Sequence, residues 1–250
     1  MAARGLISFD AAGTLIQVSK PVATTYAEFA QDHGISVNES SLKVAFREAW
    51  SRFTPPLHPD GKPSPDDDRA WWQELVRQVF ATALGYPMPT EVFSSLFDAL
   101  YQHYAKPESW IVYDDVFPAL ALLRENFDLC VLSNFDRRLF SILEGHDLIY
   151  PFGAVIISSE VGAAKPHPRM FATALKTMGA QFSSSLHVGD DVRNDIEGAQ
   201  TAGWHAFLVQ RPQASLLTLA EKVLSGAYSG LQDDRRRVAN PPPSARVAQR

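Results

Sequence analysis

The sequence predicts an α/β fold: a doubly wound (Rossmann-like) parallel sheet core with an inserted helical bundle. Short apolar runs alternate with amphipathic segments, most of the runs are continuously apolar, and a long helical region separates the first run from the second. Continuously apolar runs are typical of parallel strands that helices cover on both faces. The alternation of such strands with helices favours a doubly wound sheet.

Five strands are expected where the apolar runs lie. In chain order they are Gly5–Phe9, Leu129–Leu132, Ala154–Ser158, Leu186–Val188 and Ala206–Val209. Amphipathic helices follow several of these strands, most clearly at Arg137–Glu144, Arg169–Met178 and Asp195–Ala202. The last two helices are followed by Gly179 and Gly203, and glycine commonly ends a helix in the left-handed conformation.

The region between the first and second strands is too long for a single crossover. We expect a bundle of four helices there, at Ala23–Asp32, Ser40–Phe53, Arg69–Leu84 and Glu91–Tyr104. Aromatic residues recur along these helices at the spacing of a bundle core. To this core we assign Trp50, Trp71, Trp72, Phe80, Phe93 and Phe97.

The expected domains follow from this pattern. Residues 1–17 and 111–228 form the sheet core, and residues 18–110 form the inserted bundle. Residues 229–250 include an Arg-Arg-Arg run, a Pro-Pro-Pro run and few apolar residues. A segment of this composition buries too little apolar surface to fold, so we predict a disordered tail.

Composition narrows the class of protein. The 250 residues carry a formal charge of -5 and are 46% hydrophobic, as in ordinary globular proteins. The mild acidity argues against a nucleic-acid-binding surface, and no window approaches the roughly 18 apolar residues of a membrane helix. The single cysteine, Cys130, excludes an intramolecular disulfide, so we expect a cytoplasmic protein. We expect it to be either a monomer or a homodimer.

Four polar segments follow predicted strands in chain order. They begin at Asp10, Ser133, Lys165 and Gly189. Chemistry in a doubly wound sheet lies beyond the carboxyl ends of the strands, so we expect the four segments to meet there. The first supplies a carboxylate and a tight turn whose amides can hold an anion, the second a hydroxyl and an amide, and the third an ammonium. The fourth supplies clustered carboxylates that suit Mg²⁺.

Together these segments resemble the motifs of the haloacid dehalogenase superfamily. The resemblance covers about residues 5–225, with the inserted bundle in place of the helical cap of that family. The segment from Ser133 to Arg138 and the Trp71-Trp72 pair further resemble one subgroup of the family. The resemblance implies a hydrolase, most often a Mg²⁺-dependent phosphatase acting on a small phosphorylated metabolite.

The resemblance also implies a role for each matching residue. Asp10 would attack phosphorus and form an aspartyl-phosphate. Mg²⁺ would be held by Asp10, the carbonyl of Ala12 and Asp190, with Asp195 or Asp191 orienting this shell. The groups expected to contact the phosphoryl oxygens or offset their charge are Gly13, Thr14, Ser133, Asn134 and Lys165.

One position departs from the phosphatase pattern. Phosphatases of the family carry an aspartate two residues after the nucleophile, and it protonates the leaving group and later activates water. This chain has Ala12 there, so the backbone metal contact is kept but the acid/base group is lost. Such a group typically contributes roughly 10²–10⁴-fold to the rate.

Four alternatives therefore stay open. The chain is a phosphatase that is slow or selective for good leaving groups, a phosphonatase-like enzyme, a 2-haloacid dehalogenase-like enzyme, or a protein that binds phosphorylated ligands without turnover. Phosphonatases share the Asp-x-Ala-Gly-Thr pattern but use a cap lysine as a Schiff base, and the insert offers Lys20, Lys43, Lys62 and Lys106. Dehalogenases need no metal, whereas Gly189-Asp190-Asp191 favours a cation site.

Several other polar residues are expected to have ordinary structural roles. We expect His58 to be an exposed loop residue rather than a substitute acid. Cys130 and His187 lie within predicted strands and should be packed, and His167 should cap the helix that follows it.

Overall fold

The structure, a computed structural model, describes residues 4–58, 60–228 and 231. The predicted disordered tail, residues 229–250, therefore lies outside the described residues apart from Leu231. Among the described residues, no helix is both long enough and apolar enough to span a membrane.

The core is a five-stranded sheet in the order β5-β4-β1-β6-β7, and every neighbouring pair is parallel. The strands are β1 (Leu6–Phe9), β4 (Asp128–Ser133), β5 (Ala154–Ile157), β6 (Ser185–Gly189) and β7 (His205–Leu208). The predicted fold class is confirmed. Because β1 is central and pairs with β4 on one side and β6 on the other, the carboxyl ends of these three strands meet.

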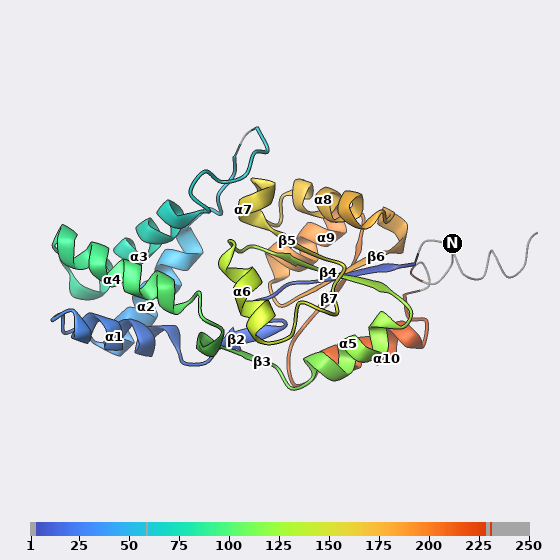
Figure 1. The fold of residues 1–250 in the computed structure, drawn as a ribbon, viewed down its shortest axis with the longest axis horizontal. Helices are drawn as coiled ribbons and strands as arrows, with labels where there is room; N and C mark the ends of the chain where they lie inside the picture. Colours follow the sequence, from blue (N-terminus) through green and yellow to red (C-terminus); the bar gives the residue numbers. More distant parts are fainter. Residues whose placement is uncertain (1–3, 59, 229–230, 232–250) are drawn as a thin grey trace, which may run out of the picture.

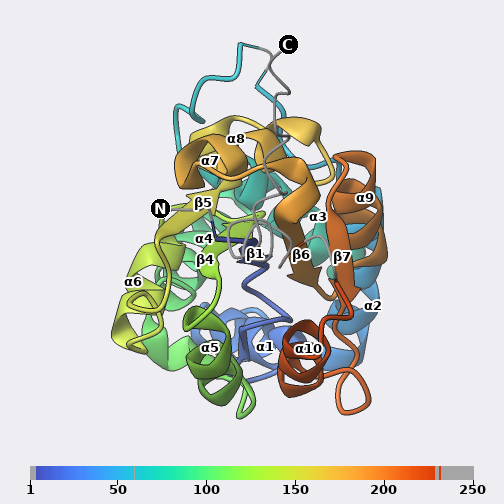
Figure 2. The same ribbon diagram turned by 90° about the vertical axis from the view of Figure 1, so that its right-hand side faces the viewer.

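Helices cover both faces of this sheet, which explains its continuously apolar strands (Figures 1 and 2). On one face lie α5 (Val116–Arg124), α6 (Arg138–Gly145) and α10 (Leu216–Leu224), packed on Ile7 and Phe9 of β1. On the other face α8 (Pro168–Met178) and α9 (Gly198–Thr201) pack on Leu6 and on Cys130 of β4. Cys130 is fully buried, as predicted.

Four helices form a separate bundle beside the sheet (Figure 1). They are α1 (Val22–Asp32), α2 (Glu39–Arg52), α3 (Arg69–Leu84) and α4 (Thr90–His103), each within one residue of its predicted bounds. The bundle has its own apolar core, in which Phe80, Phe93 and Phe97 are at most 1% exposed. We call this bundle the cap.

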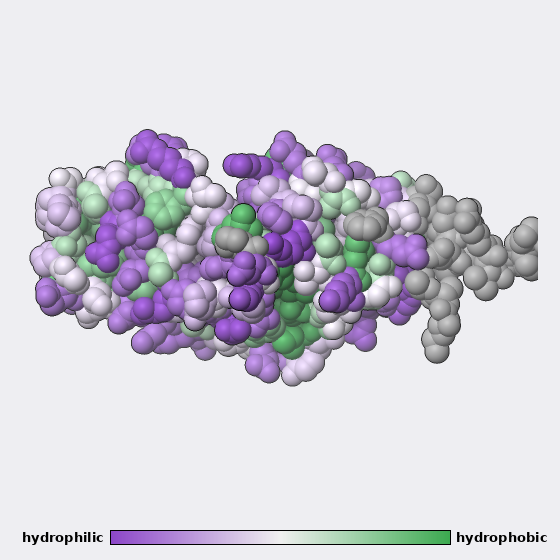
Figure 3. Space-filling view, turned by 90° about the horizontal axis from the view of Figure 1, so that it is seen from above, coloured by the Kyte–Doolittle hydropathy of each residue, from purple (hydrophilic) through white to green (hydrophobic). Residues whose placement is uncertain are grey.

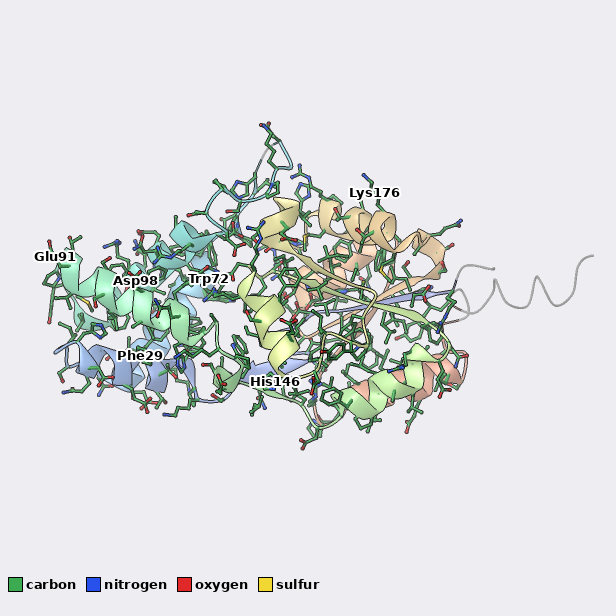
Figure 4. All side chains as sticks on the ribbon, in the orientation of Figure 1. Phe29, Trp72, Glu91, Asp98, His146 and Lys176 are labelled. Carbon is green, nitrogen blue, oxygen red and sulfur yellow. The ribbon has the colours of Figure 1, made fainter. Side chains whose placement is uncertain are left out.

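The assignment of Trp50 to the cap core is wrong. Trp50 is 50% exposed, and Trp71 and Trp72 are only partly buried against the core cluster. Figure 4 shows Trp72 at the end of the cap nearest the sheet, whereas Glu91 lies at the far end. Helical spacing placed the tryptophans on one stripe, but the stripe continues past the bundle centre onto the surface that faces the core.

Two short strands and one loop connect the cap to the core. The strands β2 (Ile16–Val18) and β3 (Trp110–Val112) form an antiparallel ribbon where the chain leaves the core and returns to it. The α2–α3 loop, residues 53–68, reaches a second place on the core, at α7 (Ser158–Val161) (Figure 1). Figure 3 shows the molecule narrowing between cap and core.

The α2–α3 loop makes both backbone and side-chain contacts with the core. His58 N donates to Gly162 O at 2.9 Å, and Ser64 N donates to Ser159 O at 2.6 Å. Asp67 accepts from Ser159 Oγ at 2.6 Å and from Arg137 N at 2.9 Å. Position 162 has a φ of +69°, and a Cβ there would lie 2.1 Å from the carbonyl oxygen of Lys62, so only glycine fits this contact.

The remaining elements were not predicted or differ from prediction. The short helices η1 (Pro107–Ser109) and η2 (Phe182–Ser184), the ribbon and α7 are too brief to give a strong local signal, and α5 is nearly uniformly apolar. The helix α10 is amphipathic, with Leu216, Leu219 and Val223 buried, and the sequence analysis missed it. The helix predicted at 195–202 begins earlier, as a π-helical turn (η3, Val192–Glu197) that continues into α9. A π-helical turn is frequent at functional sites, and this one carries Asp195.

Candidate active site

Asp10 lies immediately after the central strand β1, at the carboxyl edge of the sheet. Its backbone N–H donates to Val188 O at 2.8 Å, which extends the pairing with β6 by one residue. Ser133, the last residue of β4, donates from Oγ to Asp10 Oδ1 at 3.0 Å. Asp10 is 8% exposed. The sheet therefore fixes the carboxylate at the centre of the edge where the predicted chemistry was expected.

Lys165 supplies a buried ammonium beside this carboxylate. Its side chain is 1% exposed, and Nζ donates to Asp10 Oδ1 at 2.8 Å and to Asp195 Oδ1 at 2.6 Å. The Asn134 side chain fixes the backbone of Lys165, since Nδ2 donates to Lys165 O at 3.0 Å and Oδ1 accepts from Lys165 N at 2.6 Å. Asn134 was predicted to bind substrate, but both polar atoms of its amide bind the backbone of Lys165 and position that lysine.

A buried histidine, His187, contacts the carboxylate of Asp195. His187 Nε2 lies 3.1 Å from Asp195 Oδ1, and Nδ1 lies 2.7 Å from Ser8 Oγ. Burial and the charge on Lys165 lower the pKa of His187, so the imidazole is neutral. A neutral ring has one N–H, and donation from Nε2 to the carboxylate leaves Nδ1 to accept from Ser8. His187, predicted to be packed, is fully buried and also orients Asp195.

The turn after Asp10 closes against the end of β6. Thr14 Oγ1 donates to Asp190 Oδ1 at 3.2 Å. Gly13 has a φ of +94°, and a Cβ there would lie 2.3 Å from Asp190 Oδ2, so a side chain at position 13 would displace this carboxylate. Gly13 and Thr14, predicted to hold an anion, therefore also set the position of Asp190.

Three carboxylates meet at this edge. One oxygen each of Asp10, Asp190 and Asp195 lies within 4.8 Å of the others. Carboxylate oxygens are the donors that Mg²⁺ prefers, and Lys165 offsets only one of the three negative charges, so the donor set fits a divalent cation. Asp195 already accepts from Lys165, His187 and Asp191 N. Asp10 and Asp190 are therefore the better placed to bind an ion directly.

Asp191 lies outside this cluster. Its carboxylate accepts from Asn194 N at 2.7 Å and caps the helical turn that follows. The structure thus does not bring together every predicted metal residue: it groups Asp10, Asp190 and Asp195, and it places Ala12 beside them on the wall of the cavity.

The pKa values of these groups are shifted from their usual values. Burial raises the pKa of Asp10 to about 6, against the opposing effect of Lys165, and Asp195 and Asp190 raise it further. Partial burial and Asp195 likewise raise the pKa of Asp190. Burial alone would lower the pKa of Lys165, but Asp10 and Asp195 raise it above its usual value. At neutral pH, Asp10 is therefore mostly ionised, and Lys165 is charged.

A cavity of about 440 Å³ extends from this edge into the cap. Its floor contains Asp10, Ser133, Lys165, Asp190 and Asp195. The walls are largely apolar, and the cap supplies aromatic side chains from Tyr26, Phe46, Trp50, Trp72, Phe97 and Tyr101. A cavity of this size with a few polar groups at one end is typical of a site for a small organic molecule.

Arg138 and Asp136 are site residues that the sequence analysis missed. Asp136 is fully buried and accepts from Arg138 Nε at 2.8 Å and Nη2 at 2.6 Å, while the guanidinium lies 3.8 Å from the Tyr101 ring centroid. Arg138 lines the cavity but is already paired and stacked. The two charges two residues apart, just after a strand, were the only local signal of this pair.

The other histidines with predicted roles lie away from the floor. His58 Nε2 is 3.5 Å from Asp68 Oδ1, and His58 is not among the described residues that line the cavity. His167 Nδ1 accepts from Arg169 N at 3.2 Å and caps α8, as predicted. Neither histidine is placed to act as the acid/base group that is missing at position 12.

Comparison with known proteins places this site in a family. The model of the haloacid dehalogenase-like hydrolases matches residues 5–203. The chain is 35% identical over 205 residues to the haloacid dehalogenase-like hydrolase domain-containing protein 3 of Mus musculus, with 82% of this chain and 81% of that protein covered. This relative belongs to the subgroup that the segment after Ser133 and the tryptophan pair had indicated.

Solved structures share the fold at low identity. A magnesium-bound structure of YfnB from Bacillus subtilis has a TM-score of 0.61 at 20% identity, covering 83% of this chain and 89% of that one. The L-2-haloacid dehalogenase of Xanthobacter autotrophicus has a TM-score of 0.62 at 21% identity, covering 93% and 87%. At these identities the likeness establishes the fold and leaves the reaction to the site residues.

Proposed function

The chain belongs to the haloacid dehalogenase-like hydrolase family, and from that premise we infer that it is a Mg²⁺-dependent phosphatase with Asp10 as its nucleophile. One observation carries the proposal: Asp10 lies within a cluster of three carboxylates and beside a single buried ammonium. This arrangement suits a divalent cation, because three carboxylates and one ammonium leave two negative charges, and the cation and Lys165 together can then hold an anionic phosphoryl group. Attack on an uncharged carbon would not need the cation.

In the first step the ionised carboxylate of Asp10 attacks phosphorus and the leaving oxygen departs. The hydrogen bonds from Ser133 and Lys165 both fall on Oδ1, so Oδ2 is the oxygen left for the reaction or for a metal. Ser133 Oγ and Lys165 Nζ then bind the transferring phosphoryl oxygens, where the fixed ammonium stabilises the transition state. When bound, Mg²⁺ would be held by Asp10, Asp190 and the carbonyl of Ala12 and would neutralise phosphoryl charge.

In the second step water attacks the aspartyl-phosphate and releases inorganic phosphate and Asp10. The leaving group of this step is a carboxylate, which needs no proton. Water activation does need a base, and position 12 offers none. We therefore expect slow turnover, and with a good leaving group a long-lived covalent intermediate, because the second step lacks its base.

The site supports the other enzyme alternatives less well. A phosphonatase needs a lysine from the cap, but among the described residues that line the cavity Lys165 of the core is the one lysine. A dehalogenase shares the fold but has no use for a cation between Asp10 and Asp190. We propose that the substrate is a small phosphorylated molecule, because the cap closes over the floor and leaves about 440 Å³.

The test is a panel of acetyl phosphate, phosphate monoesters, phosphonoacetaldehyde and 2-haloacids, each assayed with Mg²⁺ and with EDTA. We expect phosphate release that EDTA abolishes. A single turnover in ¹⁸O-labelled water separates the reactions: attack of water at phosphorus labels the phosphate, whereas hydrolysis of a carbon ester labels Asp10. Turnover that survives EDTA, or ¹⁸O in Asp10, would contradict the proposal.

A further inference from the structure

The floor and the walls of the cavity together restrict the leaving group. The floor lacks an acid at position 12, so the departing oxygen leaves without a proton from there. The tyrosines of the walls are poor substitutes, because burial raises the pKa of Tyr101 and Tyr104 to about 12. The site therefore favours a leaving group that is stable as an anion.

The walls offer little to a polar leaving group. Above the floor, the charged residues of the described cavity lining are Arg138, which is paired with Asp136 and stacked on Tyr101, and Asp191, whose carboxylate accepts from Asn194 N. The Asn134 amide is bound to the backbone of Lys165, so the remaining polar side chains of the walls are those of Gln17, Asn194 and the tyrosines. A sugar or a charged metabolite would lose hydrogen bonds to water here without replacing them, at a cost in affinity.

The walls do offer aromatic faces. Trp50 is 50% exposed and stacks on Phe46 at a centroid distance of 5.9 Å and an angle of 11°. Trp50 also stacks on Trp72 at 6.0 Å and 30°. All three rings line the cavity. An aromatic ring of the substrate would extend this stack and cover part of the exposed surface of Trp50.

We propose that the substrate is an aryl phosphate, whose leaving group is an uncharged aromatic ring system bearing a phenolic oxygen. This rests on the proposed phosphatase function. The carboxylate of Asp10 forms a bond to phosphorus while the bond from phosphorus to the aryl oxygen breaks, and the phenolate keeps the electron pair and takes a proton from solvent after release. Water then attacks phosphorus, frees Asp10 and gives its proton to solvent.

The chemistry of the leaving group matches the missing acid. A phenol has a pKa of about 10, whereas a simple alcohol is nearly as weak an acid as water, at roughly 16. A phenolate therefore departs unaided far more readily than an alkoxide. One class of substrate thus satisfies both the acid-free floor and the aromatic walls.

The first experiment compares four substrates with Mg²⁺: 1-naphthyl phosphate, 2-cyclohexylethyl phosphate, glycerol 3-phosphate and acetyl phosphate. We expect kcat/KM for the naphthyl ester to exceed that of the similarly apolar cyclohexylethyl ester by about 10²-fold or more, because kcat/KM reports the first step and the second ester needs the missing acid there. We expect KM for the naphthyl ester to be at least about tenfold below that of acetyl phosphate, which has no ring to stack.

The second experiment uses Trp50→Ala, with Tyr86→Ala as its control. Both residues are about half exposed, but Tyr86 does not line the cavity. Trp50→Ala should raise KM for 1-naphthyl phosphate about tenfold, acting mainly on KM rather than kcat, and should change KM for acetyl phosphate much less, because acetyl phosphate has no ring to stack. Trp50→Phe should restore most of the loss. Tyr86→Ala should change neither KM nor kcat for either substrate.

The outcomes separate this inference from the proposed function. Mg²⁺-dependent turnover of acetyl phosphate with no preference for the naphthyl ester over glycerol 3-phosphate would overturn the inference alone. A Trp50→Ala effect of equal size on both substrates would do the same. No turnover of any of the four would overturn the proposed function, and the inference with it.

Discussion

The floor and the walls of the cavity are built from different parts of the chain and differ in kind. The floor comes from the carboxyl ends of β1, β4 and β6 and, for Lys165, from the segment between α7 and α8, and each of its charged groups has fixed partners. The walls come mostly from cap helices, and their aromatic rings pack on one another, as Trp50 does on Phe46 and Trp72, while Trp50 stays half exposed. Under the proposed function, this difference assigns the reaction to the sheet and the choice of substrate to the cap.

Removing the ammonium of the floor should give the largest effect. Lys165→Met leaves three carboxylates without their cation, so we expect kcat on acetyl phosphate to fall about 10²–10³-fold. The pKa of Asp10 should rise, so the acidic limb of the pH–rate profile should move to higher pH. Lys176→Met, at an exposed lysine of α8 (Figure 4), serves as the control. A loss below about fivefold would remove Lys165 from transition-state stabilisation.

Restoring the missing acid should act through the floor alone. Ala12→Asp should raise kcat on glycerol 3-phosphate about 10²-fold, because the alkoxide can then leave with a proton. Acetyl phosphate needs no such help in its first step and should gain less. Steady-state kinetics on both substrates measure the ratio. An equal gain on both would show that the defect lies in the second step, and no gain would show that more than position 12 has diverged.

Metal binding should depend on pH through Asp10. Its pKa is raised to about 6, so the metal-free protein gains stability from the protonated carboxyl at low pH and loses it as pH rises through 6. Mg²⁺ needs the ionised form, so its affinity should fall about tenfold between pH 7 and pH 5. Calorimetric titration at both values measures the change, and the rise in Tm with Mg²⁺ should be larger at pH 7. Equal affinity at both would contradict this assignment of Asp10.

Much of the floor was predictable from the sequence. The carboxyl ends of parallel strands lie at the same edge of a sheet, so the polar residues after each apolar run could be placed together from the sequence. Asp191 was the exception among the carboxylates, because adjacent aspartates are equivalent in sequence and only the backbone decides which one caps the next turn. His187 and Ser8 carry no signal at all, since each is one polar residue inside an apolar strand.

The walls were much less predictable. The helices of the cap follow their periodicity closely, yet periodicity assigned Trp50 and Phe80 to the same core. Which rings face the cavity depends on how the cap sits on the sheet, and that depends on contacts of high sequence separation. The docking of Asp67 on Ser159 and Arg137 is one such contact, across a loop with no local signature.

The smallest expected effect concerns how the walls are held over the floor. Asp67→Ala removes two hydrogen bonds between the α2–α3 loop and the core, so we expect unfolding free energy to fall by about 1 kcal/mol. The kcat/KM should fall severalfold, mainly through KM, because the cap would close less often. Asp60→Ala, in the same loop but on an exposed ion pair, is the matched control. Equal behaviour of the two variants would show that this contact does not position the cap.

The central claim is that Asp10 forms a phosphoryl-enzyme intermediate, and it is tested most directly by trapping that intermediate. The protein is mixed with Mg²⁺ and acetyl phosphate, quenched in acid, reduced with borohydride and digested for mass spectrometry. We predict one modified peptide, converted to homoserine at position 10, which disappears with EDTA and in Asp10→Asn. Modification at another residue, or full turnover by Asp10→Asn, would contradict the account.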